Sequence, residues 1–479
     1  MKIPSVSAKE QKELNALLWL VACGFFMQTL DATIVNTALP SMARSMGESP
    51  LRMQSVVVSY SLTMAMLIPA SGWIADRFGT RRVYVGAIAM FVAGSLLCAA
   101  SASLTQLVAA RVVQGMGGAL LLPVGRLSVL RSFPRSHFLP AMSFMAIPGL
   151  LGPLMGPTLG GWLVEVASWH WIFLINLPVG LLGGVATLIY MRGAPLKLAA
   201  RFDLVGYLLL AFGMVCISLA LDGMSSLGLS QAGVLLLIIF GLASLSSYWL
   251  HAARHDDPLF PPDLFSNPTL SVGLLGNLFS RLGSSGMPLM VPLLLQISMG
   301  YSPLHAGMMM LPVALAAMTV KRLVTTLITR AGYRRVLVVN TMLLGVIMAS
   351  FALTSPDRPW WALSLQLTCF GALNSLQFTA MNTLTLKDLD PVHASSGNAL
   401  LSMVQMLAIG MGVASAGGVL AAFTGLFGSA TPAQTLNAFH ATFVCMGLMT
   451  LASASIFWQL TPSESRVPQS ASSELSDAG

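Results

Sequence analysis

Apolar stretches of about twenty residues, separated by short polar segments, dominate the hydropathy pattern of this chain. A helix needs about 20 such residues to cross a hydrocarbon core of about 30 Å. Helices are expected rather than strands, because each span must satisfy its own backbone hydrogen bonds. The pattern predicts fourteen transmembrane helices, at about 16–38, 53–74, 83–101, 105–125, 140–163, 171–191, 204–222, 231–250, 270–296, 304–326, 335–354, 361–384, 397–424 and 437–459.

The spacing of these helices predicts an all-α polytopic membrane protein arranged as 6 + 2 + 6. A polar stretch rich in Pro and Asp, 251–268, follows the eighth helix. We expect an N-terminal six-helix bundle over 1–191, a linker with two additional transmembrane helices over 192–268 and a C-terminal six-helix bundle over 269–460. The Ser-rich end, 461–479, is expected to be a disordered cytoplasmic tail.

The second and third helices are joined by a short, strongly charged segment with the sequence Gly72-Trp-Ile-Ala-Asp76-Arg77-Phe-Gly79-Thr-Arg81-Arg82. A partial copy, Arg330-Ala-Gly332-Tyr-Arg334-Arg335, follows 253 residues later (332 − 79), with Thr329 in place of the acid. Two charged hairpins between long apolar segments indicate a duplicated membrane protein, with both copies on the same side of the bilayer.

Composition and charge agree with a membrane protein. Hydrophobic residues make up 55% and charged residues only 9% of the chain, against roughly 25% charged in soluble proteins. With the N-terminus inside, twenty of the 25 lysines and arginines fall in cytoplasmic segments and three in outer loops. This bias predicts that both termini are cytoplasmic, and the protein is expected in a bacterial-type inner (plasma) membrane. The bias also explains the net charge of +8 without a nucleic-acid partner.

Two charged residues are predicted at one depth in the membrane, Asp31 in the first helix and Arg111 in the fourth. Each would be costly alone in hydrocarbon, so they are expected to pair or to face a water-filled cavity. A structural ion pair without proton traffic is the alternative.

A third intramembrane charge, Arg281, lies near the predicted midplane of the ninth helix, without an acid at similar depth in the last six helices. It can bind backbone carbonyls of its own Gly- and Pro-broken helix, pair with Asp31, or contact substrate. The surplus of one positive charge favours an organic anion or a metal chelate over an organic cation.

The fifth helix carries Gly152, Pro153, Gly156, Pro157, Gly160 and Gly161. Glycines four residues apart share one helix face and allow a neighbouring backbone to approach closely. The two prolines are expected to kink this span.

These segments resemble known transporter motifs. The Gly72–Arg82 hairpin resembles the signature of the major facilitator superfamily, and the fifth helix resembles the antiporter signature of its drug:proton exporters. The segments around Asp31, Arg111, 169–178 and 202–206 resemble the fourteen-helix drug:proton antiporters, the DHA2 family. The resemblance implies two bundles around a central cavity, proton coupling by Asp31 and Arg111, and a gating latch at Asp76 and Arg77.

The predicted function is proton-coupled antiport that exports small organic solutes by alternating access. The expected partners are a small-molecule substrate, protons and the lipid bilayer, and the protein is expected to act as a monomer without a cofactor. Residues expected at the substrate cavity are Gln114, Asn277, Arg281, Gln296, Asn374 and Gln377. A membrane sensor that binds ligand without flux and a strictly cationic drug exporter are the alternatives.

No Walker loop and no clear catalytic signature occurs, so an enzyme is not predicted. His251 and His255 are four residues apart, but without a clear third ligand no metal site is assigned.

Overall fold

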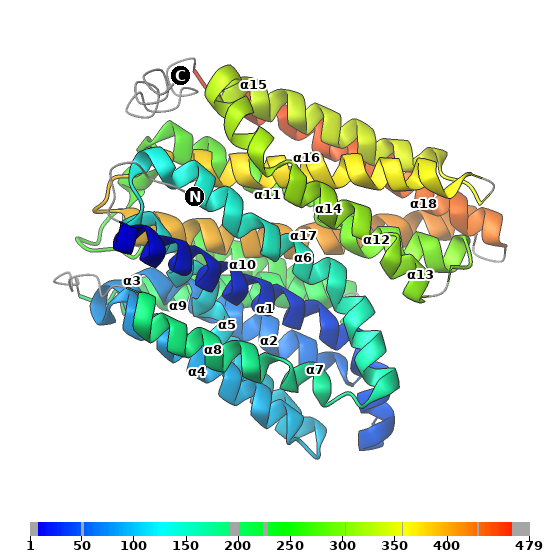
Figure 1. Cartoon of the computed structure of the whole chain (residues 1–479), viewed down its shortest axis with the longest axis horizontal. Helices are drawn as coiled ribbons and strands as arrows, with labels where there is room; N and C mark the ends of the chain where they lie inside the picture. The colour runs from blue at the N-terminus through cyan, green and yellow to red at the C-terminus, as the bar shows by residue number, and fades with distance from the viewer. Residues whose placement is uncertain are drawn as a thin grey trace. The chain divides into compact units, whose positions relative to one another are not determined.

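A computed structural model describes residues 8–48, 52–191, 201–223, 229–301, 303–356, 358–428 and 431–461. Helices make up its regular structure, and no strand occurs in these ranges (Figure 1). The predicted all-α class is therefore confirmed. The predicted disordered tail lies outside the described residues, apart from Thr461.

The first half of the chain begins with α1 (Ala8–Met46), α2 (Gln54–Leu67), η1 (Ile68–Ala70), α3 (Ser71–Phe78), α4 (Thr80–Ala99) and α5 (Leu104–Ser132). It continues with α6 (Arg135–Val166), α7 (Trp171–Leu174), α8 (Asn176–Tyr190), α9 (Leu204–Gly223) and α10 (Gln231–Ala252).

The second half begins with η2 (Pro262–Ser266), α11 (Pro268–Ser284), α12 (Met287–Leu293), η3 (Leu294–Ser298), α13 (Pro303–Met308) and α14 (Leu311–Thr319). It ends with α15 (Lys321–Ser350), η4 (Phe351–Leu353), α16 (Trp360–Lys387), α17 (Ala394–Phe427) and α18 (Pro432–Trp458).

Eleven helical segments of the described chain are long and apolar enough to cross a membrane. The three other predicted spans lie in α6, in α16, and across α13, α14 and the start of α15. The last of these is broken into short helices where Pro312 stands in the first turn of α14. A proline is favoured at that position because it lacks the N–H that a helix interior needs.

The described residues form two compact units. One unit draws on 1–133, 155–266 and 389–406, and the other on 134–154, 267–388 and 407–479. α6 and α17 each contribute residues to both units. The predicted bundle boundaries at 191 and 268 remain a prediction.

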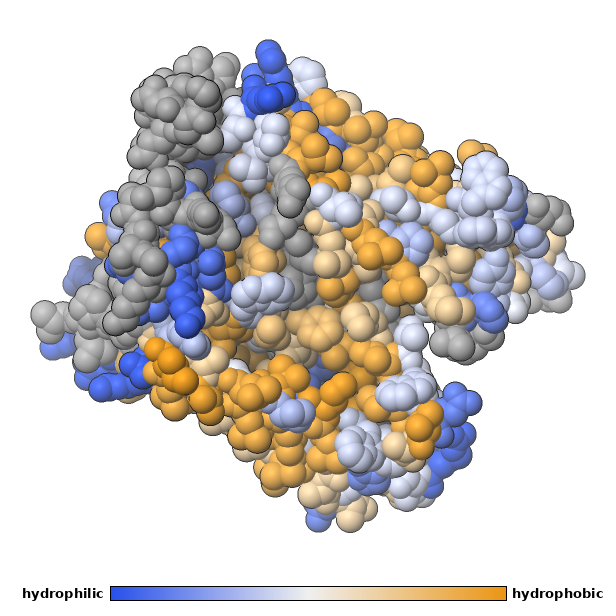
Figure 2. Space-filling view, viewed as in Figure 1, coloured by the Kyte–Doolittle hydropathy of each residue, from blue (hydrophilic) through white to orange (hydrophobic). Residues whose placement is uncertain are grey.

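Each unit has apolar side chains both inside and outside. In the first, Ile34, Phe173 and Leu107 are fully buried in one cluster, whereas Leu182 of α8 is 73% exposed. Figure 2 shows wide apolar areas on the visible face, with hydrophilic residues gathered toward the ends of helices. Exposed apolar side chains of this kind are expected on helices that face lipid.

The two charged hairpins share one backbone bend. Gly79, between α3 and α4, has φ 82° and ψ 138°, and Gly332 inside α15 has φ 76° and ψ 161°. Residues with a Cβ rarely adopt these angles. The repeat predicted from the sequence thus extends to the backbone, and the predicted loop between the second and third spans is reduced to Gly79 alone.

Candidate functional site

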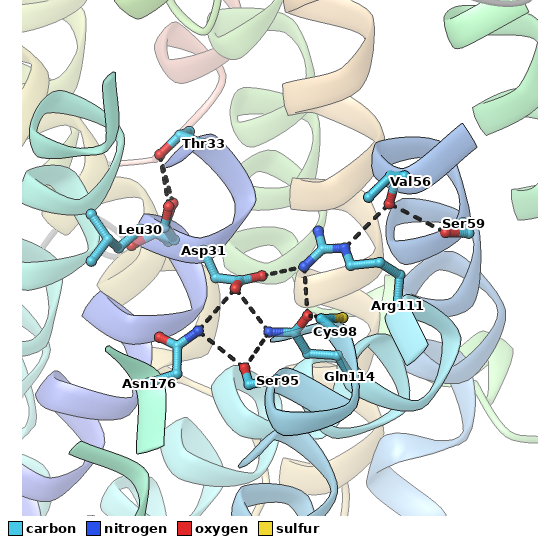
Figure 3. A network of polar contacts seen from close by, with 11 residues as sticks. Leu30, Asp31, Thr33, Val56, Ser59, Ser95, Cys98, Arg111, Gln114 and Asn176 are labelled. Carbon is cyan, nitrogen blue, oxygen red and sulfur yellow. Dashed lines mark hydrogen bonds and ion pairs between the residues drawn. The ribbon is translucent and has the colours of Figure 1, made fainter. Parts of the chain in front are cut away.

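A buried polar network surrounds Asp31 in the first unit. Asp31 lies on α1, Ser95 on α4, Arg111 and Gln114 one turn apart on α5, and Asn176 at the start of α8. None of these residues is more than 2% exposed. Figure 3 shows the carboxylate between the guanidinium of Arg111 and the amides of Gln114 and Asn176.

Both oxygens of the Asp31 carboxylate accept hydrogen bonds. Arg111 Nη1 donates to Oδ2 at 2.6 Å, while Gln114 Nε2 and Asn176 Nδ2 donate to Oδ1 at 2.8 and 3.0 Å. Charge-assisted bonds of this kind are stronger than neutral ones. The arrangement stabilises the ionised carboxylate, because a protonated acid would lose part of this acceptor capacity.

Arg111 is held from several sides. Its Nε donates to the Val56 carbonyl at 3.2 Å, and Nη1 also donates to Gln114 Oε1 at 2.7 Å. The guanidinium carbon lies 4.1 Å from the Tyr60 ring centroid and 5.9 Å from that of Phe173. Such cation–π contacts favour the charged form. The predicted pairing of Asp31 with Arg111 is present.

Sequence reasoning missed Ser95 and Asn176 as site residues. Ser95 Oγ accepts from Gln114 Nε2 at 2.7 Å and from Asn176 Nδ2 at 3.1 Å. It thereby joins the two amides that hold Asp31. A single serine in an apolar span carries no signal of its own in the sequence. Gln114 is fully buried among these partners, and its place at a substrate cavity stays a prediction.

The backbone of Gln114 lies against Gly94 of α4. A Cβ at residue 94 would come 2.4 Å from the Gln114 backbone nitrogen, whereas a Cβ at Gly86 of the same helix meets nothing within 4 Å. We expect Gly94→Ala to lower stability by about 1–3 kcal/mol and to reduce transport by displacing Gln114. Gly86→Ala is the matched control and should be neutral or stabilising by up to about 1 kcal/mol.

Thermal unfolding of both purified variants in detergent measures this difference. Equal melting temperatures for the two would contradict the close packing at Gly94.

Arg281 is the buried cation of the second unit. It is 8% exposed on α11, its Nε donates to Asn277 Oδ1 at 3.2 Å, and its guanidinium carbon lies 4.7 Å from the Phe378 ring centroid. Nη2 is buried without a hydrogen-bond partner, and no ion pair of the described residues includes Arg281. A buried charge in this state is costly unless another group binds it.

Gln377 of α16 occupies a position in the second unit like that of Gln114 in the first. Its Nε2 donates to Thr341 Oγ1 of α15 at 2.8 Å and lies 3.4 Å from Ser280 Oγ of α11. Gln114 of α5 likewise donates to the Ser95 hydroxyl of α4 and to the Asp31 carboxylate of α1. The difference is that the α1 group is a carboxylate, whereas the α11 group is a hydroxyl.

The other predicted cavity residues differ in exposure. Asn277 is fully buried and donates to the Gly273 carbonyl at 2.9 Å. Asn374 is half-buried on α16, and Gln296 is exposed in η3. The structure therefore brings Asn277 to Arg281, whereas Gln296 lies on the surface of its unit.

The predicted gating hairpin places Asp76 beside Arg131 of α5 and Ser395 of α17, and both side chains bond its carboxylate. Ser395 lies in the first turn of α17, where the helix dipole favours an anion. Gly72 permits this approach, since a Cβ there would lie 2.8 Å from the Ser395 carbonyl oxygen. Arg77 is exposed, and the arginine that bonds Asp76 is Arg131.

The remaining hairpin arginines lie at its edge. Arg81 donates to the Leu188 carbonyl of α8, and Arg82 is exposed. Arg126, one of the twenty lysines and arginines that the predicted topology places in cytoplasmic segments, is 2% exposed within α5 and donates to Gln405 of α17 at 2.8 Å. A residue count cannot separate a buried arginine near a helix end from one in the following loop.

The glycines of the predicted antiporter helix lie in α6. A Cβ at Gly156 would come 2.2 Å from Thr33 Oγ1, and one at Gly160 would come 2.9 Å from the Ile34 carbonyl oxygen. Gly161 has a looser contact, 4.0 Å to Thr37. α6 therefore approaches α1 closely, one turn from Asp31. Gly152 is buried, and the side chains of Pro153 and Pro157 lie outside the described part of the chain.

Comparisons with known proteins test the family and the fold. The profile of the Major Facilitator Superfamily matches residues 21–413. A Pectobacterium carotovorum protein, provisionally named multidrug resistance protein MdtD, is 51% identical over 440 residues, which cover 92% of this chain and 94% of its own. The equally named Serratia proteamaculans protein is 50% identical over 440 residues, with 92% of each chain covered.

Two solved structures share the fold. The human organic anion transporter MFSD10 (TETRAN) has a TM-score of 0.66 at 16% identity, covering 93% of this chain and 99% of its own. The proton:xylose symporter XylE, bound to 6-bromo-6-deoxy-D-glucose, has a TM-score of 0.66 at 14% identity, with coverage of 97% and 99%.

The family resemblance inferred from the motifs is thus confirmed over most of the chain, and with it the major facilitator fold. Both bacterial relatives have names that refer to multidrug resistance, and eleven helical segments of the described chain are long and apolar enough to span a membrane. The chain therefore belongs to the major facilitator superfamily, as an MdtD-type multi-pass membrane transporter and not an enzyme.

Proposed function

We propose that this transporter is a proton-coupled antiporter that exports small organic solutes, with Asp31 as the proton carrier. The observation that carries the proposal is the fully enclosed Asp31–Arg111 pair, with Gln114 and Asn176 on the same carboxylate. Ionisable groups buried in a membrane are costly and mark ion or substrate pathways. The names of the MdtD relatives, which refer to multidrug resistance, support export.

In the proposed cycle, Asp31 takes a proton from the outer side of the membrane. The neutral acid loses the Coulomb attraction to Arg111 and turns one acceptor oxygen into a donor, which faces amide donors of Gln114 or Asn176. The network then rearranges and the substrate is released outward. Loss of the proton to the cytoplasm restores the ion pair and resets the site for the next molecule.

Asp76, bonded to Arg131 and Ser395, supports a gating role for the hairpin. Breaking these bonds would free the first turn of α17 from α3 and α5. We propose Asp76 and Arg131 as the latch in place of the expected Asp76 and Arg77, because Arg131 bonds the Asp76 carboxylate and Arg77 is exposed. The partial second copy lacks the acid, so the latch is one-sided. We further propose that the protein is a monomer and that both of its termini are cytoplasmic.

The substrate class we propose is an organic anion or a metal chelate, such as a carboxylate of the citrate type. Arg281 supports this class, because its buried guanidinium has an unpaired Nη2 and no carboxylate partner among the described residues. An organic cation near this group would be repelled, whereas a carboxylate would supply the missing charge. The competing possibilities are a strictly cationic drug exporter and a sensor that binds without flux.

Uptake into inverted membrane vesicles tests the proposal. An imposed pH gradient, acidic inside, should drive accumulation of labelled small carboxylates or their metal complexes, and a protonophore should abolish it. Accumulation of cationic dyes alone would favour the cationic exporter. Saturable binding without gradient-driven uptake would favour the sensor.

A further inference from the structure

Three metal-binding side chains meet at one end of the α9–α10 pair. Asp203 precedes α9, His251 lies in the last turn of α10, and His255 follows that helix. One donor atom from each lies within 4.8 Å of the other two. The local sequence supplied only the two histidines, and the fold adds the third ligand from 48 residues earlier.

Asp203 is a buried carboxylate with binding capacity to spare. Its Oδ1 accepts from the Gly206 backbone N–H at 2.7 Å and lies 2.9 Å from His251 Nε2. Its Oδ2 is buried without a hydrogen-bond partner among the described residues. A Cβ at residue 206 would lie 2.1 Å from this oxygen, so glycine keeps it free of side-chain contact. Burial of a carboxylate oxygen without a hydrogen-bond partner is costly unless another group binds it.

The two histidines supply nitrogen donors beside this carboxylate. Their ring centroids are 5.0 Å apart, and exposure rises from buried Asp203 through half-buried His251 to exposed His255. Zinc prefers tetrahedral sites of imidazole and carboxylate ligands at about 2.0–2.2 Å, which places donor atoms roughly 3.3 Å apart. The three donor atoms already lie within 4.8 Å of one another, so side-chain adjustments would bring them to that geometry. Water or the exposed Asp256 and Asp257 can fill the fourth position.

The cluster is supported by firmly packed neighbours in the same unit. Tyr248, one turn before His251, accepts from the Phe260 N–H at 2.7 Å and holds the segment after α10. Phe202, next to Asp203, packs against Trp73 of α3, with 4.6 Å between the ring centroids and 53° between the ring planes. The cluster is therefore adjacent to the helix that carries Asp76.

We propose that Asp203, His251 and His255 form a binding site for a divalent cation of the zinc class, which fastens α9 to the end of α10 beside α3. Bound metal would replace the direct His251–Asp203 contact by two metal–ligand bonds and would recruit His255. The site is separate from the proposed transport residues, and its existence does not depend on the direction or the substrate of transport.

Metal titration of the full chain, purified in detergent without a histidine tag and stripped with a chelator, tests the site. Calorimetry with Zn²⁺ should show one saturable ion per chain, and Co²⁺ should give the visible absorption of a tetrahedral complex. His251→Ala and His255→Ala should each weaken Zn²⁺ binding at least about tenfold. Zn²⁺ should also raise the melting temperature of the wild type but not of these variants.

His393→Ala is the matched control, because His393 is half-buried and lies outside the cluster. It should bind Zn²⁺ as the wild type does. Circular dichroism establishes that each variant is folded. The proposal is overturned if the wild type binds no ion saturably, or if the His251 and His255 variants bind as tightly as the control.

Discussion

Replacing Asp31 with asparagine is expected to abolish proton-coupled export while the protein still reaches the membrane. Asparagine keeps an oxygen that can accept from Arg111 but has no titratable proton. Its amide would also oppose the donors of Gln114 and Asn176 on the former Oδ1 side. The stability cost should stay below the roughly 3–5 kcal/mol of losing a buried ion partner outright, because an acceptor remains.

Gradient-driven uptake into inverted vesicles, normalised to the amount of protein, measures this effect. Asp263→Asn is the matched control, since Asp263 is exposed in η2 and should leave uptake unchanged. A second variant, Asp31→Asn with Arg111→Gln, removes both charges, so it should fold better than the single change yet remain uncoupled. Full coupling in either variant would refute the role of Asp31.

Replacing Arg281 with alanine is expected to lower export of organic anions at least about tenfold while leaving cationic dyes unaffected or improved. Losing one partner of a buried charge pair costs about 2–5 kcal/mol, and each 1.4 kcal/mol is a factor of about ten in affinity. The same change removes an unpaired buried cation from the substrate-free protein. Its stability should therefore hold or rise, which separates a binding defect from misfolding.

Two further arginine variants sharpen this test. Arg281→Lys keeps the charge but loses the planar fork, so it should retain part of the anion export. Arg330→Ala removes an exposed arginine of the second hairpin and should have no comparable effect on anion affinity. Unchanged anion export in Arg281→Ala would exclude the anion site, although Asp31 could still carry the proton.

Much of the fold can be predicted from the sequence because the length of an apolar run shows whether it can span the membrane as a helix. Each helix must satisfy its backbone within one segment, so an apolar run of the right length predicts a span directly. The bend at Gly332 was also predictable, since its spacing from Gly79 repeats with the surrounding arginines. The break in the span at 304–326 was less accessible, because Pro312 can either kink a helix or begin one.

The site was only partly predictable because its contacts join helices far apart in the chain. Asp31 and Arg111 are conspicuous as charges among apolar residues. Ser95 and Asn176 are not, since small polar side chains are common in membrane helices and most bond only their neighbours. The cluster at Asp203 was equally hard to predict, because its two histidines follow 48 and 52 residues later in the chain. They come close to Asp203 only because α9 packs against α10.

The matching glutamines, Gln114 and Gln377, have a practical consequence for engineering. Each bonds groups on two other helices of its own unit. Gln114 bonds a carboxylate and a hydroxyl, whereas Gln377 bonds two hydroxyls and the amide of Asn340. Under the proposed function, proton coupling at Asp31 and substrate recognition at Arg281 can therefore be altered separately. Variant libraries confined to the surroundings of Arg281 should change substrate selectivity and leave proton coupling unchanged. Changes around Gln114 should instead alter the number of protons transported in each cycle.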